Sequence, residues 1–185
     1  MFFRKGVLIL ILWVFSTYAY TQTIYMTRTG SVSFVSNAPL EIIKASSSSL
    51  AGAINLADNK FAFIIPNQSL KGFNSELQQE HFYENYMEVE KYANSTFEGK
   101  IIEKIDGNSD EVQQLRAKGK LNIHGVEQER IIEASIQFKG EKIIVLSDFN
   151  VELKDHNIHI PRIVNQKIAE TIEVKIKAEL ELKKD

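Results

Sequence analysis

The feature that most constrains the fold is an alternation of apolar and charged residues near the C-terminus. Between Ile172 and Leu182 every second residue is apolar, and the residues between them are Glu or Lys. A period of two is typical of a β-strand with one dry face and one face in water. A helix would spread the same charges around its whole circumference. The segment therefore predicts a long amphipathic strand.

Shorter segments along the chain repeat this pattern, and turn residues separate them. Asp58 and Asn59 predict a turn, Gly125 and Gly140 permit two more, and the polar stretch 106–111 predicts a hairpin loop. Pro66 is expected to end one of the strands. The predicted strands include residues 31–35, 50–56, 61–65, 121–123, 126–138, 143–146 and 149–153.

One segment departs from the period of two. Residues 75–86 lack the alternation, and Ser75 stands where an N-cap is expected, with Gln78 three residues later in the capping-box position. The pattern predicts a short helix between strands. Its apolar side is expected to carry Leu77, Phe82, Tyr83 or Tyr86.

Many strands, one helix and no visible internal repeat predict an all-β fold, either a sandwich or a barrel. Unpaired strand edges promote aggregation, and closure into a barrel removes them. About eight strands close around a space wide enough for one small ligand. A closed antiparallel barrel of about eight strands is therefore the expected architecture.

Composition excludes several other classes. The chain has 185 residues, 44% of them hydrophobic and 25% charged, which is typical of one globular domain. It has no Cys, so disulfides, thiolate metal sites and a Cys nucleophile are excluded. Its formal net charge of −2 argues against nucleic-acid binding, which needs a concentrated basic surface. Glycine-rich phosphate-binding motifs are absent from the sequence.

The N-terminus has the order of a secretory signal peptide. Arg4 and Lys5 precede an unbroken apolar run over residues 6–15, and small residues such as Ala19 follow. Ten apolar residues span only about 15 Å as a helix, too short for a permanent membrane anchor. We therefore expect a signal peptide over residues 1–21 and a mature domain over residues 22–185, in the periplasm or secreted.

Four segments together resemble the YceI-like family of exported lipid-binding proteins. They are HFYENYMEVEKYANSTFEGKI at 81–101, GKLNIHGVEQE at 119–129, the opening strand at 30–34 and the closing part at 148–182. Each motif alone is loose, but their order and spacing make the match specific, and together they cover nearly the whole mature chain. Two positions depart from the family: Gly30 stands where a His is usual, and Ala93 where a Pro is common.

The resemblance implies an extended, lipocalin-like antiparallel β-barrel with a helical element. It also implies that a long-chain amphiphile, such as a polyisoprenoid, a quinone or a fatty acid derivative, binds in an elongated apolar cavity. It implies neither an enzyme nor a cofactor. Gly30 removes any contact to a ligand head group that the family's His makes at this place.

The ligand-binding residues are predicted from strand parity and from the expected helix. They are Val32, Phe34, Ile54, Phe61, Phe63, Phe82, Tyr86, Phe97, Leu121 and Ile123. Parity shows which residues face inward together, but the same pattern fits a packed core. The sequence therefore leaves open whether these residues line a cavity or fill the barrel.

Other motifs carry weaker signals. His156 and His159 have H-x-x-H spacing, but 155–161 is expected to be a turn followed by a strand, where the two rings point to opposite faces. No metal site is therefore expected. His124, in the Ile-His-Gly turn, is interpreted as structural, with a ligand contact as the alternative. The serine run 46–49 is interpreted as a solvated turn or edge stretch.

Three functions are compatible with these observations. The first is an exported carrier that sequesters a long-chain amphiphile. The second is a protein with a filled barrel that acts through its surface. The third is an enzyme on the same scaffold, which would need titratable groups converging in the pocket. A two-fold dimer is the commonest outcome when such a protein oligomerises, and the sequence does not decide between monomer and homodimer.

Overall fold

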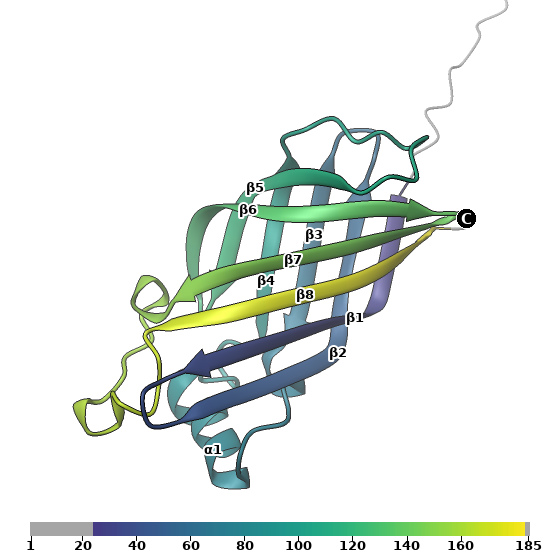
Figure 1. The fold of residues 1–185 in the computed structure, drawn as a ribbon. Helices are drawn as coiled ribbons and strands as arrows, with labels where there is room; N and C mark the ends of the chain where they lie inside the picture. The colour runs from purple at the N-terminus through teal and green to yellow at the C-terminus, as the bar shows by residue number, and fades with distance from the viewer. Residues whose placement is uncertain (1–23, 184–185) are drawn as a thin grey trace, which may run out of the picture.

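The structure of the protein is a computed structural model that describes residues 24–183. The predicted signal peptide therefore lies outside the described residues. Eight antiparallel strands form a closed barrel in which each strand pairs with its neighbours in sequence and β8 returns to β1 (Figure 1). The strands are β1 (Ile24–Asn37), β2 (Ile42–Asn55), β3 (Lys60–Pro66), β4 (Asn94–Ile101), β5 (Gln113–Ile123), β6 (Val126–Lys139), β7 (Lys142–Glu152) and β8 (Thr171–Leu182).

The barrel consists of two leaves that join at one end only. Strands β2 and β3 pair through residues 51–55 and 60–64, next to the turn that connects them. Strands β6 and β7 pair through residues 134–139 and 142–147, again next to their turn. Beyond these short ladders the leaf β7-β8-β1-β2 separates from the leaf β3-β4-β5-β6. The joined side is called the closed end, and the other side the open end.

The densest core lies toward the closed end. Ile143 and Leu180 are fully buried, and the rings of Tyr25 and Phe138 meet edge to face with 6.1 Å between centroids. These residues face inward from strands that are paired on both sides, so each side chain has neighbours all around it. Because residues 24–182 contain all eight strands and this core, that part of the chain carries the complete barrel.

Two insertions lie across the open end (Figure 1). Residues 67–93, between β3 and β4, contain the 3₁₀ turn η1 (Asn67–Ser69), the helix α1 (Glu76–His81) and the π-helical turn η2 (Phe82–Tyr86). Residues 153–170, between β7 and β8, contain the 3₁₀ turns η3 (Leu153–His156) and η4 (Arg162–Val164). Within residues 24–183 no helix is long and apolar enough to span a membrane.

The helical segment confirms the sequence prediction in position and in its cap. The Ser75 side chain accepts a hydrogen bond from the Gln78 amide at 3.1 Å, as an N-cap should. At its C-terminal end the α-helix changes to a π-helical turn. There the Met87 amide donates to the carbonyl of Phe82, the fifth residue before it, and not to that of the fourth. The Tyr83 hydroxyl donates to the Leu70 carbonyl at 2.6 Å and so ties the π-helical turn to the start of the insertion.

One sequence prediction was wrong and another was right in part. The serines at 46–49 form no turn but lie inside β2, in the stretch that pairs with β1 and has no ladder to β3, so the edge interpretation holds. Ser46, Ser48 and Ser49 are exposed. Ser47 is buried and hydrogen-bonds to Ser69 of the first insertion at 2.7 Å, which satisfies its hydroxyl. Residues 155–161 form no strand, because η3 ends at His156 and the next residue, Asn157, has the left-handed φ of 55°.

Candidate functional site: an apolar cavity beneath the open end

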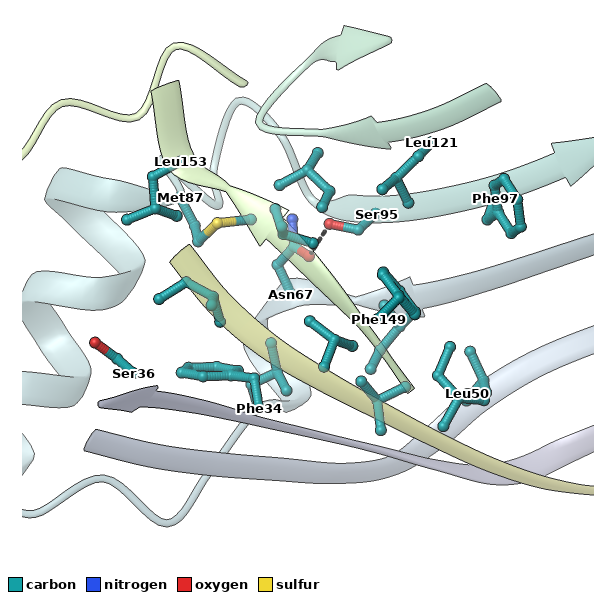
Figure 2. Close-up of a pocket in the computed structure, with 18 of the residues that line it drawn as sticks. Phe34, Ser36, Leu50, Asn67, Met87, Ser95, Phe97, Leu121, Phe149 and Leu153 are labelled. Atoms are coloured by element: carbon teal, nitrogen blue, oxygen red, sulfur yellow. Dashed lines mark hydrogen bonds between the residues drawn. The ribbon is translucent and has the colours of Figure 1, made fainter. Parts of the chain in front are cut away.

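A cavity of about 500 Å³ lies between the two leaves and opens at the end where they separate. All eight strands and both insertions contribute lining residues, and Figure 2 shows side chains from several of these elements converging on it. A filled barrel, which the sequence also allowed, is therefore not the observed arrangement. The volume is within the range of small-molecule binding sites in proteins.

The cavity is apolar because its walls are the inward faces of amphipathic strands. Ile172, Val174 and Ile176 line it from β8, while the Glu and Lys residues between them point outward. On β5 the lining extends from Leu115 to Ile123. At about 3.3 Å per residue these eight steps correspond to a length of roughly 26 Å. The site is therefore long and narrow, a shape that fits an extended chain.

All ten residues predicted from the sequence line this cavity, although their contact with a ligand stays a prediction. They are Val32, Phe34, Ile54, Phe61, Phe63, Phe82, Tyr86, Phe97, Leu121 and Ile123. Ile54 and Phe61 lie deep, at the start of the closed end. The rings of Phe34 and Phe82 stack near the mouth with 5.5 Å between their centroids. The Phe73 ring packs beside them, with its centroid 4.9 Å from that of Phe82.

Sequence reasoning missed other lining residues. Phe149, Val174 and Ile176 share the parity that identified Val32 and Phe34, so the same pattern could have found them. Met87, Leu153 and Phe73 come from the insertions, and no periodic pattern places them there (Figure 2 shows Met87 and Leu153 together). The lining residues on the strands could therefore be predicted from strand parity, whereas the lining residues on the insertions at the open end could not.

One polar pair lies inside the apolar lining. The buried Asn67 amide donates to the Tyr92 carbonyl at 2.7 Å. It also accepts from the Ser95 hydroxyl at 2.7 Å, the bond that Figure 2 shows as a dashed line. These bonds fasten the two ends of the first insertion to each other. The Ser95 oxygen keeps acceptor capacity after donating its proton, so it can receive one hydrogen bond from a bound molecule.

Ionisable side chains line the cavity only at its mouth, apart from the Tyr86 phenol. Glu41, His81 and Lys167 are the charged or potentially charged lining residues in the described part of the chain. Glu41 Oε1 accepts from Asn74 Nδ2 at 3.1 Å and from Gln78 Nε2 at 2.9 Å. Burial raises the pKa of the Tyr86 phenol. A ligand is therefore expected to keep its tail inside and its polar head at the mouth.

The wall is thin where the β6–β7 ladder ends. The last pair is Ala134 with Ser147, and the Ser147 hydroxyl then donates to the Glu133 carbonyl at 2.7 Å. Farther toward the open end, Arg130 Nη2 donates to the Asn150 carbonyl at 2.8 Å. A hollow on the outer face shares Ala134, Ser147 and Ile176 with the cavity lining. Side chains thus replace main-chain pairing along this seam.

Two histidines, His124 and His156, support the open end and do not line the cavity. His124 adopts a left-handed φ of 53°; its Nδ1 lies 3.1 Å from the His156 carbonyl oxygen and its Nε2 3.1 Å from Glu88 Oε2. Together these contacts connect the first insertion, the β5–β6 turn and the second insertion. His124 does not line the cavity, which agrees with the structural interpretation.

His156 is fully buried, whereas His159 is exposed, so the two rings do not share a site. His156 Nδ1 donates to the Val126 carbonyl at 3.1 Å, but Nε2 has no hydrogen-bond partner. Desolvation lowers the pKa of this imidazole. Within residues 24–183, no three His, Asp or Glu side chains converge in a way that could hold a metal ion.

Comparisons with known proteins agree with this geometry. The family model described as the YceI-like domain matches residues 25–180. No curated protein matches the sequence closely enough to support an argument.

Three solved structures have the same fold. A polyisoprenoid-binding domain from Saccharophagus degradans, implicated in plant cell wall breakdown, is 16% identical with a TM-score of 0.75, covering 88% of this chain and 100% of that one. Burkholderia cenocepacia BcnA is 13% identical with a TM-score of 0.66, covering 82% and 95%. The Campylobacter jejuni YceI protein is 20% identical with a TM-score of 0.58, covering 74% and 81%.

Proposed function

The chain belongs to the YceI-like family, and from this premise we propose that its barrel sequesters or carries a long-chain amphiphilic lipid, with a polyisoprenoid as the first candidate. The observation that carries the proposal is the long apolar cavity, whose fixed charges all lie at the mouth. The description of the Saccharophagus degradans domain as polyisoprenoid-binding supports the choice of ligand class.

The energetics of such binding are favourable. Burying roughly 600 Å² of apolar tail contributes roughly 15 kcal/mol gross at about 25 cal/mol per Å². Association and ordering of the tail cost a large part of this gain. Micromolar or tighter affinity is still within reach from apolar contact alone. The length and shape of the tail then determine specificity more than the head group does, so quinones and fatty acid derivatives belong to the same candidate class.

We propose a binding protein and not an enzyme, because the family is a binding-protein family and the deep cavity presents aliphatic and aromatic side chains. No cofactor is needed for this role. The cationic start and short apolar run of the N-terminus support export to the periplasm or beyond. An exported carrier would shield a tail that is insoluble in the surrounding water.

The test uses a substitution that reduces the volume of the deep part of the cavity and leaves the residues at the mouth unchanged. Ala117 lines the cavity on β5, and Ala62 is exposed on β3, so Ala117→Phe and Ala62→Phe form a matched pair. Binding of farnesol, geranylgeraniol and stearate is measured by displacement of a fluorescent apolar dye. We expect Ala117→Phe to weaken binding of the longest chain by about tenfold or more, since the added ring occupies the space for the chain end.

The Ala62→Phe protein is expected to bind all three compounds like the wild type. If none of the three displaces the dye from the wild type, or if Ala117→Phe and Ala62→Phe behave alike, the proposed use of the cavity is wrong. Far-ultraviolet circular dichroism of both variants establishes that the barrel is intact before the affinities are compared.

A further inference from the structure

The most exposed large apolar side chains of the described residues gather around the mouth of the cavity. Ile163 is 91% exposed, Leu40 is 66% exposed and Leu77 is 59% exposed, more than any other large hydrophobic residue in residues 24–183. They come from three segments: η4, the β1–β2 turn and α1. All three segments lie at the open end (Figure 1). We call these three residues the rim.

Hydrogen bonds hold the three segments together. The Leu40 amide donates to the Gln166 carbonyl at 2.8 Å, which joins the β1–β2 turn to the second insertion. Gln78 Nε2 donates to Glu41 Oε1 at 2.9 Å, which joins the same turn to α1. Leu77 lines the cavity mouth, and so do Glu41 and Val164, the chain neighbours of Leu40 and Ile163. The rim therefore borders the entrance.

Apart from Glu41, whose carboxylate accepts hydrogen bonds from Asn74 and Gln78, the charges around the rim are divided between two sides. Residues 156–169 contain no Asp or Glu but carry Arg162 and Lys167, both exposed, on either side of Ile163 and Val164. The opposite side, α1 and η2, carries the exposed Glu76, Glu80 and Glu84. An exposed isoleucine flanked by cations is suited to a phospholipid surface, where apolar side chains enter the acyl boundary and cations contact phosphates.

We propose that the open end docks on the surface of a phospholipid bilayer. In this arrangement Ile163 and Leu40 insert at the boundary between head groups and acyl chains, Arg162 and Lys167 contact lipid phosphates, and the acidic side of α1 faces away from the surface. The apolar rim is continuous with the apolar cavity, so a tail can pass from the bilayer into the barrel without crossing water. Docking does not depend on which amphiphile binds.

The first test uses single tryptophan reporters. The only Trp of the sequence is Trp13, so residues 22–185 contain none. Ile163→Trp places a reporter on the rim, and Val112→Trp places one near the closed end at a site that is 55% exposed. With vesicles of phosphatidylethanolamine and phosphatidylglycerol, we expect the emission of the rim reporter to shift to the blue and that of the closed-end reporter to stay unchanged. Equal responses at both sites would overturn the proposal.

The second test measures co-sedimentation with the same vesicles. Leu40→Asp and Ile163→Asp are expected to lower the partition coefficient about tenfold or more, and Val112→Asp to leave it unchanged. Arg162→Gln with Lys167→Gln should weaken binding only when phosphatidylglycerol is present. A wild type that does not sediment with vesicles, or rim variants that match Val112→Asp, would contradict docking and would assign the rim to a protein partner.

The two proposals fail separately. Leu40, Ile163 and Val112 do not line the cavity, so their Asp variants should bind amphiphiles in solution like the wild type. Loss of dye displacement with intact vesicle binding would reject the ligand proposal alone. Loss of vesicle binding with intact dye displacement would reject docking alone.

Discussion

The two halves of strand β7 have the same inward pattern of apolar side chains but different surroundings. Near the closed end, Ile143 lies between Phe138 of β6 and Leu180 of β8 and is fully buried. Near the open end, Phe149 keeps its partner Val174 on β8 but has no ladder partner on β6, and it faces the cavity. On β7, the fully buried core position is therefore paired on both sides, and the half of the strand that has lost its β6 ladder faces the cavity.

The largest expected effect tests this difference directly. Ile143 and Ile172 are the same residue type on neighbouring strands, the first in the core and the second on the cavity wall. Ile143→Ala should lower the free energy of unfolding by about 2–5 kcal/mol, because it leaves a hole among packed atoms. Ile172→Ala should cost about 1 kcal/mol, because its side chain already borders empty space and has fewer contacts to lose.

Urea denaturation of both variants gives these two values. Equal losses at the two positions would mean that the open half is packed as tightly as the closed half, and the comparison between the ends would then be wrong.

A second prediction concerns the pH dependence at the open end. His156 is buried with Nε2 unpartnered, so its pKa is lower in the folded protein than the ordinary value near 6.5. The unfolded chain therefore takes up a proton first as the pH falls through 6.5, and the folded state loses stability. The slope from this one group is at most about 1.4 kcal/mol per pH unit.

His156→Gln replaces the imidazole with a side-chain amide that does not titrate, so the stability of the variant should depend less on pH between 7 and 5. His159→Gln, at an exposed position, provides the control and should follow the wild type. The explanation fails if His156→Gln has the same pH slope as the wild-type protein in urea denaturation.

The seam between β6 and β7 is expected to show the smallest effect. Amides of β7 in residues 148–151 that point toward β6 should exchange with solvent faster than those in residues 142–147, which belong to the ladder. Arg130→Ala removes the hydrogen bond to the Asn150 carbonyl, worth about 1 kcal/mol, and should speed exchange at 148–151 by roughly fivefold. Hydrogen exchange read by NMR resolves these amides individually, and uniform protection along β7 would contradict an open seam.

Strand parity predicted an all-β fold and much of the cavity wall, while the choice of a barrel over a sandwich needed the edge-strand argument and the family resemblance. The alternation around Val174 and the inward positions of Phe34 and Leu121 follow from side-chain direction in a strand, which is a local property. The emptiness of the barrel is not local. It depends on where the β6–β7 ladder ends, and there the Ser147 hydroxyl takes the Glu133 carbonyl that a main-chain amide would otherwise bind.

The errors in the sequence reasoning have the same origin. Ser47 is a poor strand residue by itself, yet Ser69 of an insertion more than twenty positions away satisfies its hydroxyl inside the fold. The 155–161 segment looked like a strand because it contains Ile158 and Ile160, but η3 and the left-handed Asn157 redirect it across the open end. Neither the Ser69 contact nor the left-handed turn at Asn157 can be read from the local pattern of apolar residues.

The central claim is that the space beneath the open end holds a long-chain amphiphile. The most direct measurement is native mass spectrometry of residues 22–185, purified without detergent from a secreting host, together with lipid extraction of the same sample. We expect a discrete added mass that extracts as an isoprenoid or fatty chain, and if the chain is long we expect a smaller bound fraction in Ala117→Phe than in Ala62→Phe. A protein that stays bare, even after incubation with long-chain amphiphiles, would contradict the central claim.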